Sequence, residues 1–350
     1  MGKNIVILRK ICYNKQRTNR AAGRVPAAFL GNEMKMVKIK SYAKINLTLE
    51  INGVEEGYHI LDSLVASVDL FDLIVVKPRK GKLSSVKMHG LGSEKIPPEQ
   101  NNALKAAEAF SAEFNTDGAE ITIYKNIPIG AGLGGSSADI VGVLRGMAQV
   151  YGIEDENALK ALADRLGSDT GYMLQGGFAR MQGRGGKVTP LDIGAKLHFL
   201  LLCPKTPVSA GACYRVYDTL PKTCQEREKF TENCIAALRE NNLNEAGRCL
   251  MNDLYIPAIT LNGEVEKAYE DARSFSPLGA VMTGSGSGVL ALFAHKELCE
   301  WAKSRYKGKC DAFVISTVTP DYAKKKKKKT GLSFSNPFVL TDEERNAIEE

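Results

Sequence analysis

The feature of this 350-residue sequence that most restricts its fold is a glycine-rich stretch at residues 126–139, which reads Asn-Ile-Pro-Ile-Gly-Ala-Gly-Leu-Gly-Gly-Ser-Ser-Ala-Asp. Residues 119–125 before it alternate between apolar and polar types, which predicts a strand. After it, apolar residues recur at the spacing of one helical face: Ile140, Val141, Leu144, Met147, Ala148 and Tyr151. The sequence therefore predicts a glycine loop that joins a strand to a helix whose first turn contains Ser136 and Ser137.

A loop of this kind is suited to binding phosphate. The first N–H groups of a helix have no partner within the helix, and the helix dipole favours an anion there. Glycines allow the backbone to approach phosphate oxygens closely, because they have no Cβ atom. The hydroxyls of Ser136 and Ser137 add groups that can reach phosphate or Mg²⁺.

Three types of phosphate loop compete for this stretch. The Walker A pattern is absent, and the Rossmann pattern G-x-G-x-x-G is matched only literally, by Gly130, Gly132 and Gly135. An acidic residue should end a second strand about 20 residues further on, but residues 152–157 predict a loop with Asn157 capping a new helix. The third pattern, P-x-G-x-G-L-x-S-S-A, matches residues 128–138 with one additional glycine before the serines. This last string resembles the phosphate loop of the GHMP kinases (galactokinase, homoserine kinase, mevalonate kinase and phosphomevalonate kinase).

Residues 41–51 alternate strictly and predict a half-buried strand. Its apolar face carries Ile45, Leu47, Leu49 and Ile51, and its other face carries Lys44, Asn46, Thr48 and Glu50. Lys44 and Asn46 point the same way, so they could hold an anion and a hydroxyl, whereas Thr48 and Glu50 are expected to face solvent. Beyond a turn at Gly53–Gly57, Tyr58 and His59 would contact a base only if their loop folds over a pocket.

The net charge of +7 comes from the two ends of the chain. Residues 1–35 carry +7 and residues 322–350 carry +2, which leaves −2 for residues 36–321. The run Lys324–Lys329 has no interleaved aromatic residues, so we interpret it as a solvated linker and expect no nucleic-acid partner. No apolar run reaches the roughly 18 residues that span a bilayer, so no membrane association is expected.

The two ends are expected to lie outside the folded body. Residues 1–35 have neither a signal-peptide core nor any serine, so they predict a disordered leader, with Met36 as an alternative start. Residues 341–344 have the spacing of a capping box and predict a short terminal helix. The eight cysteines form no C-x-x-C pair and the four histidines are far apart, so a zinc site is not expected. We expect the cysteines to be reduced thiols in the cytoplasm.

From about Met36 to about Thr319 the chain resembles one branch of the GHMP superfamily, the 4-diphosphocytidyl-2-C-methyl-D-erythritol kinases. Ala43–Leu47 followed by Gly57–His59 is similar to the branch's opening A-K-[IV]-N-L…G-[YF]-H. Further similar segments are Asn101 with the helix after it, Val208–Tyr214, Gly176-Gly177…Gly183-Arg-Gly, and the glycine loop within Gly279–Phe293.

Two segments depart from the pattern of this branch. Where the branch has G-A-D-V-P-F-F, residues 167–173 keep Asp169 but not the Val-Pro, after a helix predicted at 157–166 that ends at Gly167 in the left-handed conformation. The phosphate loop has one glycine fewer than the usual G-L-x-G-G-S-S-D, and its aspartate, Asp139, comes one residue later.

The resemblance implies an α+β, two-domain GHMP kinase fold. A ribosomal-protein-S5-like ATP domain would cover 36–193, a ferredoxin-like α/β domain would cover 194–319, and residues 320–350 would form the lysine-rich linker and short helix. In the second domain we expect a strand at 197–203, helices near 228–251 and 262–274, and strands flanking the 284–288 loop. The implied reaction is the ATP-dependent phosphorylation of the 2-hydroxyl of 4-diphosphocytidyl-2-C-methyl-D-erythritol in non-mevalonate isoprenoid biosynthesis, by a monomer or homodimer.

The resemblance also implies roles for individual residues. Asp169 would take the proton of the accepting hydroxyl, and Lys44 would stabilise the charge that develops on the γ-phosphoryl group. The residues implied for ATP are Asn101, Lys125, Pro128, Gly130, Ala131, Gly132, Leu133, Gly134, Gly135, Ser136 and Ser137, with Ser136 as a Mg²⁺ ligand. Those implied for the substrate are Asn46, Tyr58, His59, Gly284, Ser285 and Gly286.

Two other functions remain open at this point. One is another small-molecule GHMP kinase that acts on a sugar or on homoserine. The other is a catalytically inactive protein of this fold that binds a ligand and regulates, which would keep the nucleotide loop but lose the lysine or the carboxylate. Both Lys44 and Asp169 are present, which favours an enzyme.

Overall fold

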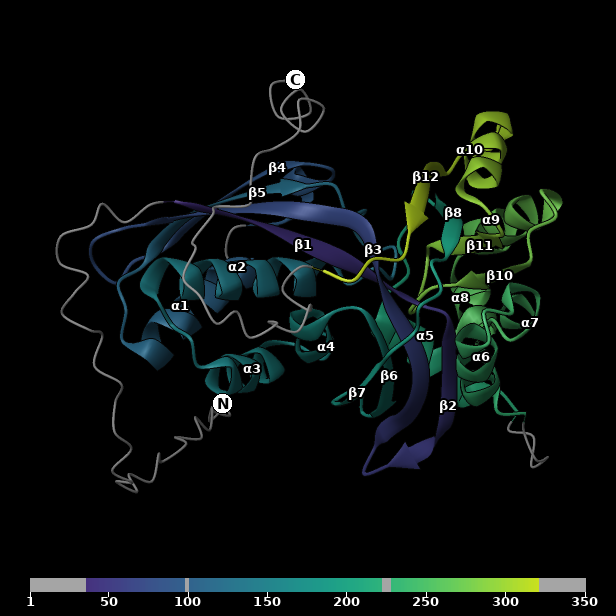
Figure 1. Cartoon of the computed structure of the whole chain (residues 1–350), viewed down its shortest axis with the longest axis horizontal. Coiled ribbons are helices and arrows are strands. Elements are labelled where there is room, and N and C mark those ends of the chain that lie inside the picture. The colour runs from purple at the N-terminus through teal and green to yellow at the C-terminus, as the bar shows by residue number, and fades with distance from the viewer. Residues whose placement is uncertain (1–35, 98–100, 222–227, 321–350) are drawn as a thin grey trace, which may run out of the picture. The chain divides into compact units, whose positions relative to one another are not determined.

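The computed structural model describes residues 36–97, 101–221 and 228–320 (Figure 1). The predictions for the basic leader, for the lysine run and for the C-terminal helix fall outside these residues. The sequence-derived domain boundaries at 193/194 and 319/320 remain predictions.

The larger sheet of the described residues is built around one long strand. Its strands are β1 (Val37–Asn46), β2 (Thr48–Glu55), β3 (Tyr58–Pro78), β4 (Ser85–Gly90), β5 (Ala119–Lys125), β6 (Phe178–Gly183), β7 (Lys187–Leu191) and β9 (Met251–Asn252). The beginning of β3 pairs antiparallel with β2 and β6, and its later part pairs antiparallel with β1 and β5. Because β3 has 21 residues, it connects the part of the sheet under the first helices with the part near the C-terminal half.

Helices α1 (Asn102–Phe114), α2 (Gly135–Tyr151), α3 (Glu156–Leu166) and α4 (Thr170–Gln175) lie on one side of this sheet (Figure 1). Helix α2 packs directly on β1 and β3, and two of its glycines make the approach close. A Cβ atom at Gly142 would lie 2.8 Å from Ile74 Cδ1, and one at Gly146 would lie 2.4 Å from Val76 Cγ2. The start of α2, and with it the glycine loop, is therefore positioned by the core.

The smaller sheet has the order β10-β11-β8-β12 and is antiparallel throughout. Its strands are β8 (His198–Cys203), β10 (Gly279–Met282), β11 (Val289–Phe293) and β12 (Asp311–Ser316). The helices around it are α5 (Ala210–Thr219), α6 (Phe230–Arg239), α7 (Leu243–Arg248), α8 (Tyr255–Leu261), α9 (Gly263–Ser274) and α10 (Lys296–Arg305).

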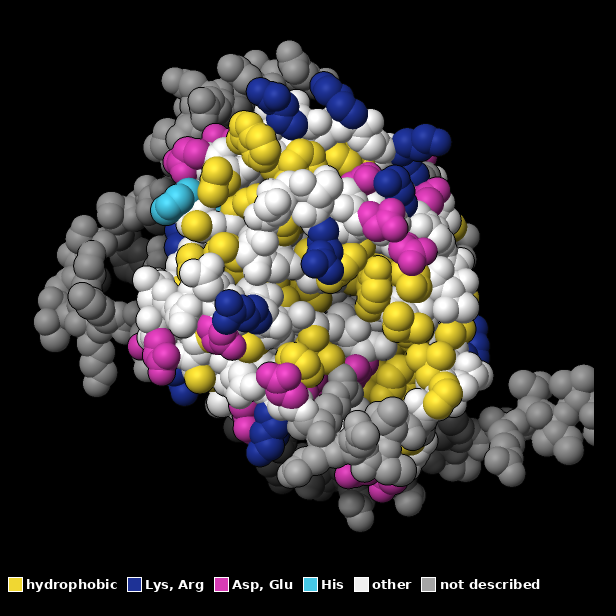
Figure 2. Space-filling view, turned by 90° about the vertical axis from the view of Figure 1, so that its right-hand side faces the viewer, with side chains coloured by type: hydrophobic (Ala, Val, Ile, Leu, Met, Phe, Trp, Pro, Cys, Tyr) yellow, Lys and Arg dark blue, Asp and Glu magenta, His cyan; other side chains and the backbone are white. Residues whose placement is uncertain are grey.

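Strand β8 is buried on both faces, which explains its nearly continuous apolar sequence. Phe199 and Leu201 belong to the core shared with the larger sheet, whereas Leu200 and Leu202 belong to a second core under the C-terminal helices. The face formed by those helices carries charged side chains of both signs, interspersed with apolar ones (Figure 2).

The first strand differs from its prediction. It begins at Val37, is interrupted at Leu47 and continues as β2 through Glu55, so the turn shrinks to Glu56 and Gly57. Thr48 and Glu50, expected in solvent, are buried because α6 covers their face. Glu50 Oε2 accepts a hydrogen bond from Thr231 N (2.9 Å), and Thr48 Oγ1 lies 2.8 Å from Thr231 Oγ1.

Three predicted helix ends are also corrected. Helix α3 is capped by Asp155, not Asn157, because the Asp155 carboxylate accepts from Ala158 N at 2.9 Å. Gly167 after α3 is extended (φ −178°) rather than left-handed. The segment predicted as one helix near 228–251 is two, α6 and α7, because Asn242 caps a new start.

Within the described ranges, no helix is both long and apolar enough to cross a membrane. The cysteines in the same ranges are free thiols: Cys203, Cys213, Cys234, Cys249, Cys299 and Cys310. No group of three or more His, Cys, Asp or Glu side chains among the described residues is arranged to hold a metal ion.

Candidate active site

The glycine loop runs from the end of β5 to the start of α2, as the sequence predicts. Gly130, Gly132 and Gly134 have φ values of +71°, +75° and +71°, in the left-handed region that favours glycine. Gly134 is the N-cap of α2, a helix of 17 residues, so the unpartnered amides of a long helix lie at the end of the loop.

The second glycine loop, residues 283–288 between β10 and β11, packs directly on the first. Ser287 N donates to Gly130 O and Gly288 N donates to Ala131 O, both at 3.2 Å. A Cβ atom at Gly132 would lie 2.1 Å from Thr283 O. Glycine is therefore required at Gly132 for the contact between the two loops, in addition to any approach of a ligand.

A cavity of about 270 Å³ lies beside the start of α2. Of the residues predicted for ATP, it is lined by Asn101, Lys125, Pro128, Gly130, Gly132, Leu133, Gly134, Gly135, Ser136 and Ser137. Ala131 does not line it: this side chain is buried in the core, and its carbonyl accepts from the second loop. We call this space the nucleotide cavity.

Asn101 has a structural partner in addition to its place at the nucleotide cavity. Its side chain caps α1 by accepting from Ala103 N at 2.9 Å, and thereby fixes the beginning of that helix. The next residue, Asn102, which the sequence did not single out, donates from Nδ2 to Ser136 Oγ at 2.9 Å. The start of α1 therefore holds one of the two loop serines.

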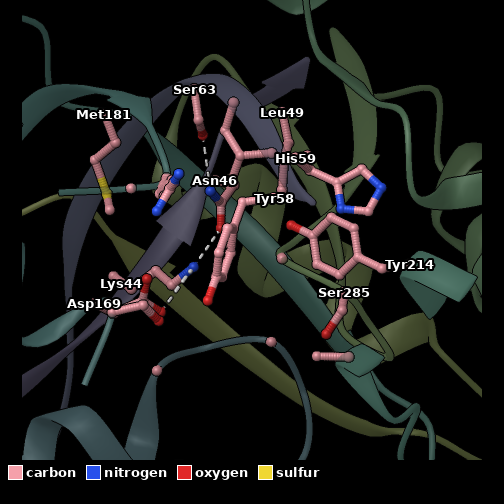
Figure 3. Close-up of a pocket in the computed structure, with 18 of the residues that line it drawn as sticks. Lys44, Asn46, Leu49, Tyr58, His59, Ser63, Asp169, Met181, Tyr214 and Ser285 are labelled. Atoms are coloured by element: carbon pink, nitrogen blue, oxygen red, sulfur yellow. Dashed lines mark hydrogen bonds and ion pairs between the residues drawn. The ribbon is translucent and has the colours of Figure 1, made fainter. Parts of the chain in front are cut away.

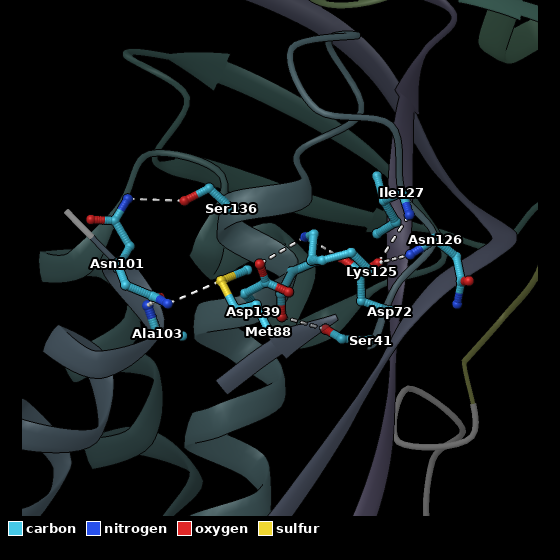
Figure 4. A network of polar contacts seen from close by, with 12 residues as sticks. Ser41, Asp72, Met88, Asn101, Ala103, Lys125, Asn126, Ile127, Ser136 and Asp139 are labelled. Atoms are coloured by element: carbon cyan, nitrogen blue, oxygen red, sulfur yellow. Dashed lines mark hydrogen bonds and ion pairs between the residues drawn. The ribbon is translucent and has the colours of Figure 1, made fainter. Parts of the chain in front are cut away.

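Lys125 is bound to two carboxylates (Figure 4). Its Nζ lies 2.5 Å from Asp72 Oδ2 and 2.7 Å from Asp139 Oδ2, and all three side chains are buried. Asp72 Oδ1 also accepts from the backbone N–H groups of Asn126 and Ile127. This network ties the start of the glycine loop to β3 and to α2. The other oxygen of Asp139, Oδ1, is buried and has no hydrogen-bond partner among the residues that the structure describes.

The pKa of Asp139 is raised to about 7, chiefly because burial disfavours its charge; Lys125 opposes this shift and Asp72 adds to it. The folded protein therefore retains a proton between about pH 4 and pH 7 that the unfolded chain has released, so stability from this group is lost as pH rises through that window. Asp139→Asn cannot ionise at this position. Its unfolding free energy relative to that of the wild type should therefore increase by roughly 1 kcal/mol per pH unit in this window. Urea unfolding of both proteins at pH 5 and pH 8 measures this gain, and an equal difference at the two pH values would contradict it.

Lys44 and Asn46 bring the first strand into contact with both glycine loops. Lys44 N donates to Leu133 O at 3.0 Å, and Asn46 N donates to Thr283 Oγ1 at 2.9 Å. Their side chains also meet, since Lys44 Nζ donates to Asn46 Oδ1 at 2.6 Å. Asn46 Nδ2 in turn donates to Ser63 Oγ (Figure 3). The amide is therefore held in one orientation next to the ammonium group.

Asp169 lies opposite this lysine. Its Oδ2 is 3.5 Å from Lys44 Nζ, and 29% of the Asp169 side chain is exposed, so the carboxylate faces both the ammonium group and the cavity (Figure 3). It immediately precedes α4, which Thr170 anchors by donating from Oγ1 to Ala163 O and Gly167 O. A carboxylate fixed beside a cation in this way can accept a proton from a hydroxyl group.

A second cavity, of about 440 Å³, contains this pair, and we call it the acceptor cavity after the role predicted for its residues. Gly132 and Gly134 line both cavities, so the glycine loop is their shared wall. Tyr58 and His59 also line the acceptor cavity, where the centre of the His59 ring lies 4.7 Å from the centre of the Tyr214 ring (Figure 3). His59 Nε2 lies 2.8 Å from Asp218 Oδ1. Burial, with a contribution from Asp169, raises the pKa of Tyr214 to about 12, so this phenol remains neutral.

The residues predicted from the second glycine loop divide into two groups. Gly284 and Ser285 line the acceptor cavity. Gly286 does not line it; a Cβ atom at this position would lie 2.9 Å from Met282 Sδ, so this glycine serves packing within the loop. Lining residues that were not among the predicted site residues include Ser63, Ser168, Met181, Arg184 and Tyr214. Of these, Ser168, Arg184 and Tyr214 stood in segments noted for their resemblance to the family, whereas no local pattern marks Ser63 and Met181.

Comparison with known proteins assigns the family. The family described as GHMP kinases N terminal domain matches residues 101–179, and GHMP kinases C terminal matches residues 234–307. A 4-diphosphocytidyl-2-C-methyl-D-erythritol kinase of Caldicellulosiruptor saccharolyticus is 34% identical over 284 residues, which are 80% of this chain and 96% of that relative. One of Clostridium tetani is 34% identical over 80% of this chain and 99% of its own length. The chain belongs to the GHMP kinase family.

As a GHMP kinase, the protein is an ATP-dependent small-molecule kinase. A crystal structure of a 4-(cytidine 5'-diphospho)-2C-methyl-D-erythritol kinase superposes with a TM-score of 0.67 and 28% identity, over 80% of this chain and 98% of that one. A homoserine kinase of Cytophaga hutchinsonii, at 19% identity and TM-score 0.63 over 82% and 96% of the two chains, shares the fold. The predicted α+β, two-domain GHMP kinase fold is thereby confirmed.

Proposed function

We propose that this kinase transfers the γ-phosphoryl group of ATP to the 2-hydroxyl of 4-diphosphocytidyl-2-C-methyl-D-erythritol, a step in the synthesis of isoprenoid precursors. The observation that carries the proposal is the aromatic group Tyr58, His59 and Tyr214 in the same cavity as Lys44 and Asp169. An acceptor with a planar base suits such a cavity, because aromatic rings stack on bases. The names of the relatives described above support the same substrate.

The proposed chemistry follows from the two cavities that share the glycine loop. ATP phosphates in the nucleotide cavity would be bound by the amides at the start of α2, and the γ-phosphoryl group would face the acceptor cavity past Gly132 and Gly134. Asp169 takes the proton of the acceptor hydroxyl while the hydroxyl oxygen attacks the γ-phosphorus of ATP, and ADP leaves. Lys44 stabilises the negative charge that spreads over the phosphoryl oxygens. The catalytic contribution of the protein is therefore placement and charge.

Mg²⁺ is proposed to accompany the nucleotide. The hydroxyl of Ser136 at the nucleotide cavity suits a hard cation, which prefers oxygen ligands. We assign Ser136 as the residue that would hold the ion. When bound, the ion neutralises phosphate charge.

ATP consumption measured with three acceptors tests the proposal. We expect turnover with 4-diphosphocytidyl-2-C-methyl-D-erythritol and none with galactose or homoserine, with the phosphorylated product identified by mass spectrometry. Turnover of galactose or homoserine instead would assign the enzyme to another branch of the family. Binding of ATP without turnover of any of the three would favour a regulator.

A further inference from the structure

Arg184 lies in the short turn between β6 and β7, and its side chain lines the acceptor cavity. Because β6 pairs with β3, with Gly183 opposite Leu61, this turn lies beside the turn between β2 and β3. The Arg184 guanidinium is 4.2 Å from the centre of the Tyr58 ring, and its Nη2 is 2.5 Å from Glu56 Oε2. Arg184 thus covers one face of the tyrosine proposed to stack on the acceptor's base.

The balance of charge in the acceptor cavity gives Arg184 a further role. Among the described residues that line it, the side chains with a full charge are Lys44, Asp169 and Arg184. Lys44 and Asp169 face each other at 3.5 Å and largely neutralise one another. Arg184 is therefore the group that leaves this lining with a net positive charge once its partner Glu56, which lies outside the lining, is displaced.

An acceptor that carries a diphosphate brings negative charge into this cavity. Removing that charge from water is costly unless a cation pairs with it. A guanidinium group is well suited, because its planar arrangement of N–H groups can donate two hydrogen bonds to phosphate oxygens. The present partner of Arg184 can be released easily, since 82% of the Glu56 side chain and 46% of the Arg184 side chain are exposed, and exposed ion pairs are weak.

We propose that Arg184 is a substrate-binding residue that pairs with the phosphate groups of the acceptor, exchanging Glu56 for the substrate. This inference rests on the proposed function. The same movement uncovers the face of Tyr58, so the base and the phosphates would be bound together. In the free protein, Glu56 and Tyr58 hold the guanidinium close to the position where it is needed.

The competing interpretation is structural: Arg184 would only fasten the two turns to each other. Inhibition by cytidine 5'-diphosphate and by cytidine separates the two, because only the first has phosphates. We expect Arg184→Gln to raise the KM for 4-diphosphocytidyl-2-C-methyl-D-erythritol at least tenfold and to weaken inhibition by cytidine 5'-diphosphate to a similar extent. Inhibition by cytidine and the KM for ATP should change less than twofold. Arg184→Lys, which keeps a charge, should recover part of the loss.

Glu56→Gln is the matched control, because it removes the partner and keeps the arginine. Here the KM for the acceptor should fall, by roughly two- to fivefold for a weak exposed pair. A KM for the acceptor that rises in Glu56→Gln as it does in Arg184→Gln would overturn the proposal. So would an Arg184→Gln variant in which inhibition by cytidine is weakened as much as inhibition by cytidine 5'-diphosphate. A wild-type enzyme that does not turn over this acceptor refutes the proposed function and the inference with it. Turnover by the wild type with an unchanged KM in Arg184→Gln refutes only the inference.

Discussion

Asp169→Asn is expected to lower kcat for phosphoryl transfer by about 10²–10⁴-fold, the usual contribution of a positioned general base. The amide has nearly the shape of the carboxylate, but it cannot take a proton from the acceptor hydroxyl. It also removes the negative charge 3.5 Å from Lys44 Nζ. The side chain is partly exposed and makes no capping hydrogen bond to α4, although Asp169 occupies the N-cap position, so the fold should persist. Steady-state kinetics with saturating ATP and acceptor measure the effect.

The control for this prediction is the same substitution at Asp164, on the neighbouring helix α3. Asp164 pairs with Lys160 four residues earlier, and both side chains are about half exposed, at 45% and 50%. Such pairs contribute little, so Asp164→Asn should leave kcat within twofold of the wild type. A kcat that is equally normal in Asp169→Asn would show that this carboxylate is not the base.

Gly132→Ala is expected to be the most damaging small substitution at the site. The added methyl group would lie 2.1 Å from Thr283 O, an atom of the second loop's backbone that cannot turn away as a side chain could. The φ of +75° adds conformational strain. Together these should cost roughly 3 kcal/mol or more of unfolding free energy. ATP binding should be lost as well, because the loop must move from the nucleotide cavity. Chemical unfolding and calorimetric titration with ATP measure the two effects.

Gly81→Ala separates the strain from the clash. Gly81 has a φ of +88°, comparable with that of Gly132, but a Cβ atom there would meet nothing within 4 Å. It should therefore cost only the conformational part, roughly 1–2 kcal/mol, and leave ATP binding intact. If the two variants lost equal stability, the contact between the glycine loops would not be what makes Gly132 necessary.

The elements that were predicted well are those whose causes are local. Strand β5 has the predicted bounds, and α2 begins at Gly135 with its predicted apolar face buried except for the half-buried Tyr151, because alternation and helical spacing depend on neighbouring residues. The positions of Lys44 and Asp169 in one cavity followed from the resemblance to a family, since the two lie 125 residues apart and no spacing connects them.

The predictions that were wrong have causes distant in the sequence. Thr48 and Glu50 were expected in solvent because a strand pattern does not reveal what covers its polar face, and the cover is Thr231 on α6. Ala131 and Gly286, whose roles at ligands remain predictions, do not line either cavity, because a motif marks a loop without showing which of its members face inward. Both instead take part in packing within and between the two loops.

The primary structure was sufficient for the family, for the phosphate loop and for the pair of chemical groups at the centre of the site, because these depend on short strings and their residue types. Only the tertiary structure gave the placement of charge. Lys125 is bound between Asp72 and Asp139, and Arg184 lies over the Tyr58 ring and pairs with Glu56. These groups meet only when β3, α2 and the turns at the ends of β2 and β6 are folded together. Electrostatic interactions depend on distance through space, which the order of residues does not contain.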